Sequence, residues 1–191
     1  VVIFHIWPSF LPSGYIGVDI FFVISGFLMN ALYLKGDTKK SASLQFYTRR
    51  FLRIIPAYVV TIFTFLLYSS FVFIPYEFLI TQQQALASLF LVPNLYFWSG
   101  ESYFNEFSFR PLLHLWTIGV EVQFYILVPF FFYLVRKKKI IFFLAMLLSF
   151  VICIKVLSFS EKTAFFMLPL RVWEFLIGFS IAHYLSVNGN I

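Results

Sequence analysis

The chain has few charged residues and a single cysteine, and each shortage excludes a class of protein. Of its 191 residues, 12% are charged, whereas 61% are hydrophobic and 23% are aromatic. A water-soluble domain carries about 25% charged residues, so that class is excluded. The one cysteine, Cys153, cannot form a disulfide within the chain, and its apolar neighbours are typical of a buried, inert thiol. The composition therefore indicates an integral membrane protein.

The sequence also lacks the short motifs of several enzyme classes. It contains no metal-ligand spacing, no GxSxG elbow, no Walker loop and no GxGxxG. Soluble-type hydrolase, nucleotide-binding and zinc functions are therefore unsupported, and we expect no metal cofactor. The net charge of +6 does not indicate nucleic acid binding, because the basic residues gather at the ends of apolar segments and are not spread over a polar face.

Apolar segments long enough for a membrane crossing, about 20 residues, recur along the chain. Full spans are expected at 15–34, 54–74, 120–135, 140–157 and 170–185, and residues 1–7 are expected to be the end of a span that is cut off upstream. The shorter segment 85–98, interrupted by Pro93, predicts a re-entrant or interfacial helix. The predicted fold class is all-α, a polytopic transmembrane helix bundle of about five full spans plus the truncated first span and this short helix.

Two groups of basic residues give the expected orientation. Six lie within a 19-residue stretch after the span at 15–34 (Lys35, Lys39, Lys40, Arg49, Arg50 and Arg53), and four follow the span at 120–135 (Arg136, Lys137, Lys138 and Lys139). Because cytoplasmic loops carry an excess of such residues, we expect the loop 35–53 to be cytoplasmic and 99–110 to be external. The spans at 54–74 and 120–135 already supply an even number of crossings between the two groups, so 85–98 is expected not to cross.

Two ionisable residues near the start of the chain are candidate functional residues, because a charge at membrane depth is costly unless it is paired or used. His5 either bonds a backbone carbonyl or exchanges a proton near neutral pH as a general base. Asp19 either takes part in catalysis or is a structural partner for a backbone amide or an arginine. Ser25 follows six residues after Asp19, so the two need not share a helical face.

The arginines at 49–53 have two interpretations. Arg50 and Arg53 are three residues apart, on one face of a helix that enters the membrane, and Arg49 precedes them. They are either orientation anchors or ligands for a cytosolic donor that carries phosphate, because the planar guanidinium binds phosphate with two hydrogen bonds.

Two further pairs of polar residues lie in the second half. His114 and Glu121 are seven residues apart, which places them on one face of a continuous helix. Glu121 lies just inside an apolar run, so we expect it to have a partner within the bundle. The pair is acid/base machinery, an ion site or a structural hydrogen bond. Arg171 and Glu174 are spaced for an ion pair within one helix.

Four sequence blocks, in this order, resemble the N-terminal half of the acyltransferase-3 family of membrane O-acyltransferases. They are His5 with PSGYIGVDIFFVISGFLM, then FYTRRFLRIIPAY, PLLHLWTIGVEVQFYILVP and RVWEFLIG. The resemblance implies a multi-pass enzyme of the plasma membrane, the bacterial inner membrane. Such an enzyme transfers an acyl group, usually acetyl, from cytosolic acyl-CoA to a hydroxyl of an extracytoplasmic glycan such as a cell-surface polysaccharide or lipopolysaccharide. Residues 1–191 are then the N-terminal part of one membrane-embedded acyltransferase domain.

The resemblance also implies roles for single residues. His5 corresponds to the first-span histidine, a general base or acyl relay, and Arg50 and Arg53 to an Arg-x-x-Arg motif that engages the CoA phosphates. His114 and Glu121 match the outer His and Glu of the family. The remaining matches are motif positions of less defined role: Asp19, Ser25, Arg171 and Glu174. One departure is that the Arg or Lys eleven positions before the first-span histidine would precede Val1.

A second class of function fits the same residues. A transporter or flippase of a lipid-linked sugar would use His5, Asp19 and Glu121 as a proton relay through the bundle. Dependence on acyl-CoA separates the two, since only the enzyme needs this donor.

Overall fold

The computed structural model describes residues 10, 13–34, 39–100 and 109–189, and all regular elements within these ranges are helices. The elements are α2 (Ile16–Leu34), α3 (Lys39–Val72), α4 (Pro75–Leu89), α5 (Pro93–Ser99), the 3-10 helix η1 (Leu113–Leu115), α6 (Trp116–Lys137), α7 (Lys139–Leu157), α8 (Glu161–Phe166) and α9 (Leu168–Val187). The predicted all-α class is confirmed.

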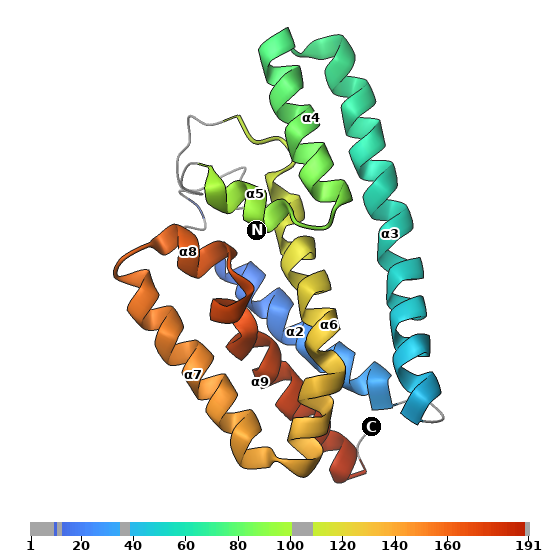
Figure 1. Cartoon of the computed structure of the whole chain (residues 1–191), viewed down its shortest axis with the longest axis vertical. Coiled ribbons are helices and arrows are strands. Elements are labelled where there is room, and N and C mark those ends of the chain that lie inside the picture. Colours follow the sequence, from blue (N-terminus) through green and yellow to red (C-terminus); the bar gives the residue numbers. More distant parts are fainter. Residues whose placement is uncertain (1–9, 11–12, 35–38, 101–108, 190–191) are drawn as a thin grey trace.

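The helices form a main body and a two-helix arm (Figure 1). Helices α2, α6, α7 and α9 make up the body, and α2 packs most extensively on α9. The arm consists of α3 and α4, which lie side by side. The short helices α5 and α8 contact each other at one end of the body and also pack on α6 and α9, respectively. The two polar clusters described below lie within this body or between it and the arm.

Four of the described helices are long and apolar enough to cross a membrane: Ile16–Tyr33, Leu44–Val72, Leu113–Lys137 and Lys139–Leu157. They coincide with four of the predicted spans. Helix α9 covers the expected segment 170–185 but is not among the four, and its Arg171, Glu174 and His183 lower its hydropathy. The total of about five full spans therefore stays a prediction, and residues 1–7 lie outside the described residues.

Helix α3 begins much earlier than predicted. The basic segment was expected to be a loop up to residue 53, but α3 starts at Lys39 and runs for 34 residues. At 1.5 Å per residue it is about 51 Å long, so it exceeds the hydrocarbon thickness of about 30 Å. Lys, Arg and Gln are good helix formers, and the apolar signal alone does not mark where such a helix begins. Arg50 and Arg53 therefore lie on one helix, as their spacing predicts, and Arg49 precedes them on it.

The predicted short helix at 85–98 is two helices. Helix α4 begins with Pro75 in its first turn, α5 begins with Pro93 in its first turn, and Leu91 between them has a positive φ of 60°. Proline is favoured at this position because its missing N–H would have no partner within the helix. The two helices have 15 and 7 residues, and neither is a candidate span. This agrees with the expectation that the segment does not cross.

The backbones of α2 and α9 touch at two glycines. A Cβ built on Gly26 would overlap the carbonyl oxygen of Phe175, and a Cβ on Gly178 would overlap the carbonyl oxygen of Val23. In lipid the hydrophobic effect does not drive helices together, and helix association depends on close van der Waals packing, which small residues such as glycine permit. Stacked rings continue the contact toward α6, where the ring centroids of Phe124 and Phe175 are 4.2 Å apart.

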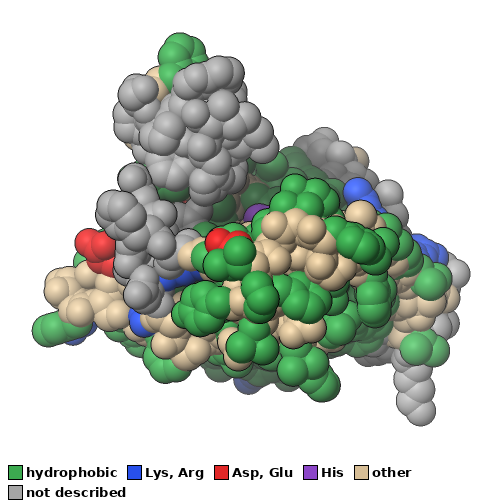
Figure 2. All heavy atoms as spheres, turned by 90° about the horizontal axis from the view of Figure 1, so that it is seen from above, with side chains coloured by type: hydrophobic (Ala, Val, Ile, Leu, Met, Phe, Trp, Pro, Cys, Tyr) green, Lys and Arg blue, Asp and Glu red, His purple; other side chains and the backbone are tan. Residues whose placement is uncertain are grey.

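The outward faces of the long helices remain apolar. The most exposed side chains on α3 and α7 include Val60, Phe63, Leu67, Phe71, Ile140, Leu144 and Leu148. Figure 2, which looks onto the end where α4 and α5 lie, shows hydrophobic side chains over much of the described surface, with a histidine side chain set among them. Such a surface suits contact with lipid or with further membrane helices.

Candidate functional site

The structure places the described candidate residues in two polar clusters and one exposed turn. The Glu121 cluster joins α2, α3 and α6, and the Arg171 cluster joins α2, α8 and α9. His114 lies in the turn before α6. His5 lies outside the described residues, so its predicted role stays a prediction.

The Glu121 cluster is built on a buried carboxylate. Glu121 is 5% exposed, and its Oε1 accepts hydrogen bonds from Tyr125 Oη at 2.7 Å and from Ser25 Oγ at 3.2 Å. Tyr125 follows four residues later on α6, so it lies one turn along the same face. Ser25 reaches across from α2. The predicted partner of Glu121 within the bundle is therefore present, in the form of two hydroxyl groups from two helices.

Arg50 completes this cluster from α3. Its guanidinium lies over the ring of Tyr125, 5.7 Å from the centroid, and the residue is 5% exposed. Its Nε and Nη2 are buried and have no hydrogen-bond partner among the described residues. A buried cation without partners is costly, whereas an arginine that merely orients a membrane span is expected to reach water. The guanidinium therefore has unused hydrogen-bonding capacity inside the bundle.

The neighbouring arginines differ from Arg50. Arg49 and Arg53 are exposed, although the charge of Arg53, like that of Arg50, acts on Glu121. Two cations and one carboxylate leave the region positive in net charge. Burial in low dielectric strengthens such a field, so this part of the bundle favours an anionic ligand.

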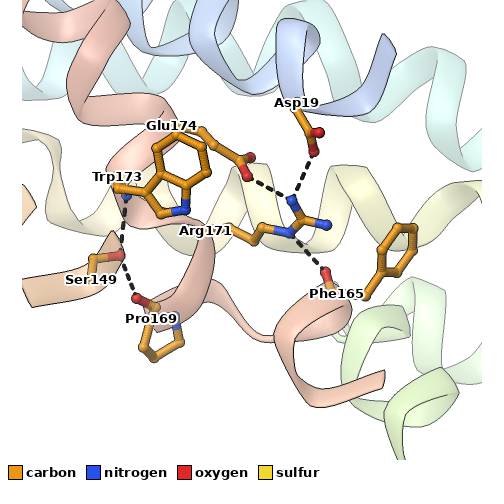
Figure 3. Close-up of polar contacts among 7 residues, drawn as sticks. All are labelled: Asp19, Ser149, Phe165, Pro169, Arg171, Trp173 and Glu174. Carbon is orange, nitrogen blue, oxygen red and sulfur yellow. Dashed lines mark hydrogen bonds and ion pairs between the residues drawn. The ribbon is translucent and has the colours of Figure 1, made fainter. Parts of the chain in front are cut away.

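The Arg171 cluster is shown in Figure 3. Arg171 Nη1 donates to Asp19 Oδ1 at 2.7 Å and to Glu174 Oε1 at 2.6 Å, and its Nε donates to the carbonyl of Phe165 at 3.2 Å. The ion pair predicted between Arg171 and Glu174 is confirmed, and Asp19 does have an arginine partner. Glu174 is fully buried, while the Asp19 side chain is 34% exposed. One guanidinium thus connects three helices, α2, α8 and α9. Asp19 is the most exposed of the three charged side chains.

Ser149 of α7 anchors the start of α9 beside this cluster. Its hydroxyl donates to the carbonyl of Pro169 at 2.7 Å and accepts from the backbone N–H of Trp173 at 3.2 Å (Figure 3). Arg171 lies between these two positions in the chain, so the bonds of Ser149 hold the turn of helix that carries the guanidinium.

His114 and Glu121 lie in two helices that follow each other directly, η1 and α6, and the shared face that their spacing predicts stays a prediction. His114 is exposed in the 3-10 helix η1, while α6 begins only at Trp116. The tighter 3-10 turn, with 3.0 instead of 3.6 residues per turn, rotates position 114 by only about 40° relative to a regular helix, but His114 is exposed whereas Glu121 is buried.

Sequence reasoning missed Tyr125, although the spacing contained a signal for it. A tyrosine four residues after a glutamate in a helix lies within reach of the carboxylate. The bond from Ser25 had no comparable signal, because 96 residues separate it from Glu121. Within the described ranges, no group of three or more His, Cys, Asp or Glu side chains is close enough to hold a metal ion.

Comparison with known proteins matches residues 1–187 to the acyltransferase domain of the acyltransferase-3 family. The chain is 38% identical over 132 residues to the O-acetyltransferase OatA of Staphylococcus aureus (strain NCTC 8325 / PS 47), a match that covers 68% of this chain and 22% of that protein. It is 36% identical over 137 residues to the putative O-acetyltransferase SACOL0978 of Staphylococcus aureus (strain COL), with the same coverage. The matches thus span 22% of the length of these relatives. No solved structure matches the chain.

Proposed function

The chain belongs to the acyltransferase-3 family, and from this we propose that it is part of a membrane enzyme that transfers an acyl group, usually acetyl, from cytosolic acyl-CoA to a hydroxyl of an extracytoplasmic glycan. We further propose that residues 1–191 are the N-terminal part of its single membrane-embedded domain, in the bacterial inner membrane. The relatives are named as O-acetyltransferases, which supports acetyl as the group transferred.

The observation that carries the proposal is the free hydrogen-bonding edge of Arg50. Nε and Nη2 lie on one side of the guanidinium, the arrangement that grips a phosphate or carboxylate with two parallel bonds, and both are buried without a partner in the described part of the chain. Coenzyme A carries phosphates and a polar pantetheine arm. We propose that Arg50 binds this donor inside the bundle, with Arg53 and Arg49 contributing charge from exposed positions.

Glu121 is then placed to handle a proton close to the donor. Its carboxylate is oriented by Ser25 and Tyr125 and lies in the electrostatic field of Arg50 and Arg53. A carboxylate held in this way can accept a proton from a reacting group and return it. We propose the complementary roles for His5 and His114 at the acceptor hydroxyl, because imidazole exchanges protons near neutral pH. Asp19, as the exposed member of the Arg171 cluster, is proposed to contact the acceptor.

The transporter alternative is tested by measuring donor dependence in the full-length protein. Arg50→Ala should weaken acyl-CoA binding by about 1.5 to 3 kcal/mol, the range for hydrogen bonds to charged groups, and Arg53→Ala, which removes an exposed charge, by less than about 1 kcal/mol. Arg50→Lys should restore only part of the acyl-CoA affinity, because an ammonium group cannot make the two parallel hydrogen bonds of the planar guanidinium. Arg136→Ala is the matched control, since this arginine is exposed near the end of α6 and lies over the ring of Phe132.

The acceptor is tested separately. Cells that lack the gene should lose O-acetyl groups from one surface glycan, as measured by mass spectrometry of the isolated glycans, and the full-length gene should restore them. His5→Ala should fail to restore them while the protein still inserts into the membrane. Unchanged acyl-CoA affinity in the Arg50 variant, together with sugar transport into vesicles, would favour the transporter.

A further inference from the structure

Gln84 of α4 is a buried polar residue that belongs to neither polar cluster. Helix α4 carries three consecutive glutamines, Gln82, Gln83 and Gln84, of which the first two are exposed and the third is 1% exposed. A buried glutamine in a membrane protein is costly unless its amide is fully bonded. The bonds that Gln84 makes therefore indicate why it is there.

The amide of Gln84 is bonded on both sides to the backbone just before His114. Its Nε2 donates to the carbonyl of Phe109 at 3.1 Å, and its Oε1 accepts from the N–H of Leu112 at 3.1 Å. The two bonds span the bend that leads into η1, where Leu113 N–H then bonds the carbonyl of Arg110. The side chain of Gln84 thus acts like a short piece of paired backbone and fixes the course of the chain two residues before His114.

The helix backbone at Gln84 is stabilised by two further hydrogen bonds, made by Ser88 and Tyr58. The hydroxyl of Ser88 donates to the backbone carbonyl of Gln84 at 2.7 Å, and the hydroxyl of Tyr58 on α3 donates to the carbonyl of Ser88 at 3.0 Å. A small apolar cluster packs around these bonds and unites α3, α4 and η1; its members are Tyr58, Ile62, Ala85, Leu112 and Leu115. The arm of the molecule therefore supports the turn that carries His114.

We propose that Gln84 is a positioning residue for His114. This inference rests on the proposed acid/base role of His114 in the transfer to the acceptor. A catalytic group must be held to within a fraction of an ångström, and a displacement of about 1 Å can cost a hundredfold in rate. His114 is exposed in η1, at the point where the chain enters α6, and the amide of Gln84 constrains the backbone on the other side of it, at Phe109 and Leu112.

The test uses the full-length enzyme with Gln84→Met, which keeps the length and approximate volume of the side chain but removes both hydrogen bonds. Hydrogen–deuterium exchange in the peptide 109–116 should become faster, because the N–H of Leu112 loses its acceptor. The kcat for acetyl transfer, per amount of folded protein, should fall at least about tenfold, with the KM for acetyl-CoA changed less than twofold. Gln82→Met, on the exposed face of the same helix, should alter neither quantity.

Two further variants separate positioning from packing. Gln84→Glu retains an acceptor for the N–H of Leu112, so exchange should slow again and part of the activity should return. In the background of His114→Ala, Gln84→Met should cause no further loss of kcat, because residues that act through one another are not additive.

Unchanged exchange in Gln84→Met, or faster exchange with unchanged kcat, would overturn the inference. If His114→Ala itself remains fully active, the proposed role of His114 fails and the positioning role fails with it. Hydrogen exchange in Gln84→Met would still become faster in that case, because the bond to Leu112 does not depend on the function of His114. Failure of the proposed donor site is recognised separately, by unchanged acyl-CoA affinity in Arg50→Ala.

Discussion

Adding a single methyl group to either glycine between α2 and α9 should destabilise the protein strongly. In Gly178→Ala the new Cβ would overlap the carbonyl oxygen of Val23, and in Gly26→Ala it would overlap that of Phe175. Both obstacles are backbone atoms of packed helices, so no side chain can rotate away. The helices would have to separate by more than about 1 Å to regain ordinary contact, and such overpacking typically costs about 1 to 3 kcal/mol, occasionally more.

The structure also provides graded controls for this experiment. A Cβ on Gly119 would lie 2.9 Å from Asn94 Oδ1 and Pro93 Cδ, so the start of α5 would have to shift, but by less than α2 and α9 would. A Cβ on Gly100 would have its nearest neighbour at 3.7 Å, so Gly100→Ala should be neutral. The expected order of stability loss is therefore Gly178 and Gly26 first, then Gly119, then Gly100.

The assay is the unfolding of purified full-length protein in detergent, followed by intrinsic fluorescence during heating or denaturant titration. The α2–α9 contact also carries the bond between Asp19 and Arg171, so the two severe variants should lose activity together with stability. A Gly178→Ala protein as stable as the Gly100→Ala protein would refute the backbone contact on which this reasoning depends.

Three further predictions concern charge, hydrogen bonding and topology. Arg171→Gln should cost about 3 to 5 kcal/mol of unfolding free energy because it leaves the buried carboxylate of Glu174 without a cation. Glu174→Gln keeps an acceptor for Nη1 and should cost less than about 1.5 kcal/mol; equal losses in the two variants would contradict the shared guanidinium. Tyr125→Phe removes the shorter bond to the buried carboxylate and should cost about 1 to 3 kcal/mol, and an unchanged unfolding midpoint would argue against that bond. Cysteines introduced at Ser99 and Lys138 should react with an impermeant thiol reagent from opposite sides of the membrane, and labelling of both from one side would exclude the predicted topology.

The sequence was sufficient to predict the four candidate membrane spans and the ion pair within α9. Apolar length identified the four candidate spans, because only a helix satisfies its backbone in lipid. The spacing of Arg171 and Glu174 predicted their ion pair, because residues three apart are neighbours on a helix. The start of α3 was not predictable in the same way, since its basic first turns are polar whether they are loop or helix.

Contacts between different helices could not be predicted from the sequence. Asp19 and Arg171 are 152 residues apart, and Ser25 and Glu121 are 96 apart, so neither pair has a local pattern. The role of Gln84 was hidden for the same reason, because its partners are backbone groups of a distant turn.

Two of the polar bonds of α2, made by Asp19 and Ser25, limit its rotation about its own axis. Asp19 and Ser25 are six residues apart, which corresponds to about 240° around the helix and about 9 Å along it. One bond is made to α9 and the other to α6, so turning α2 in either direction breaks at least one of them. Because the glycine contact also prevents α2 from rolling closer to α9, any movement of this helix during a reaction cycle has to carry its neighbours with it as a single rigid unit.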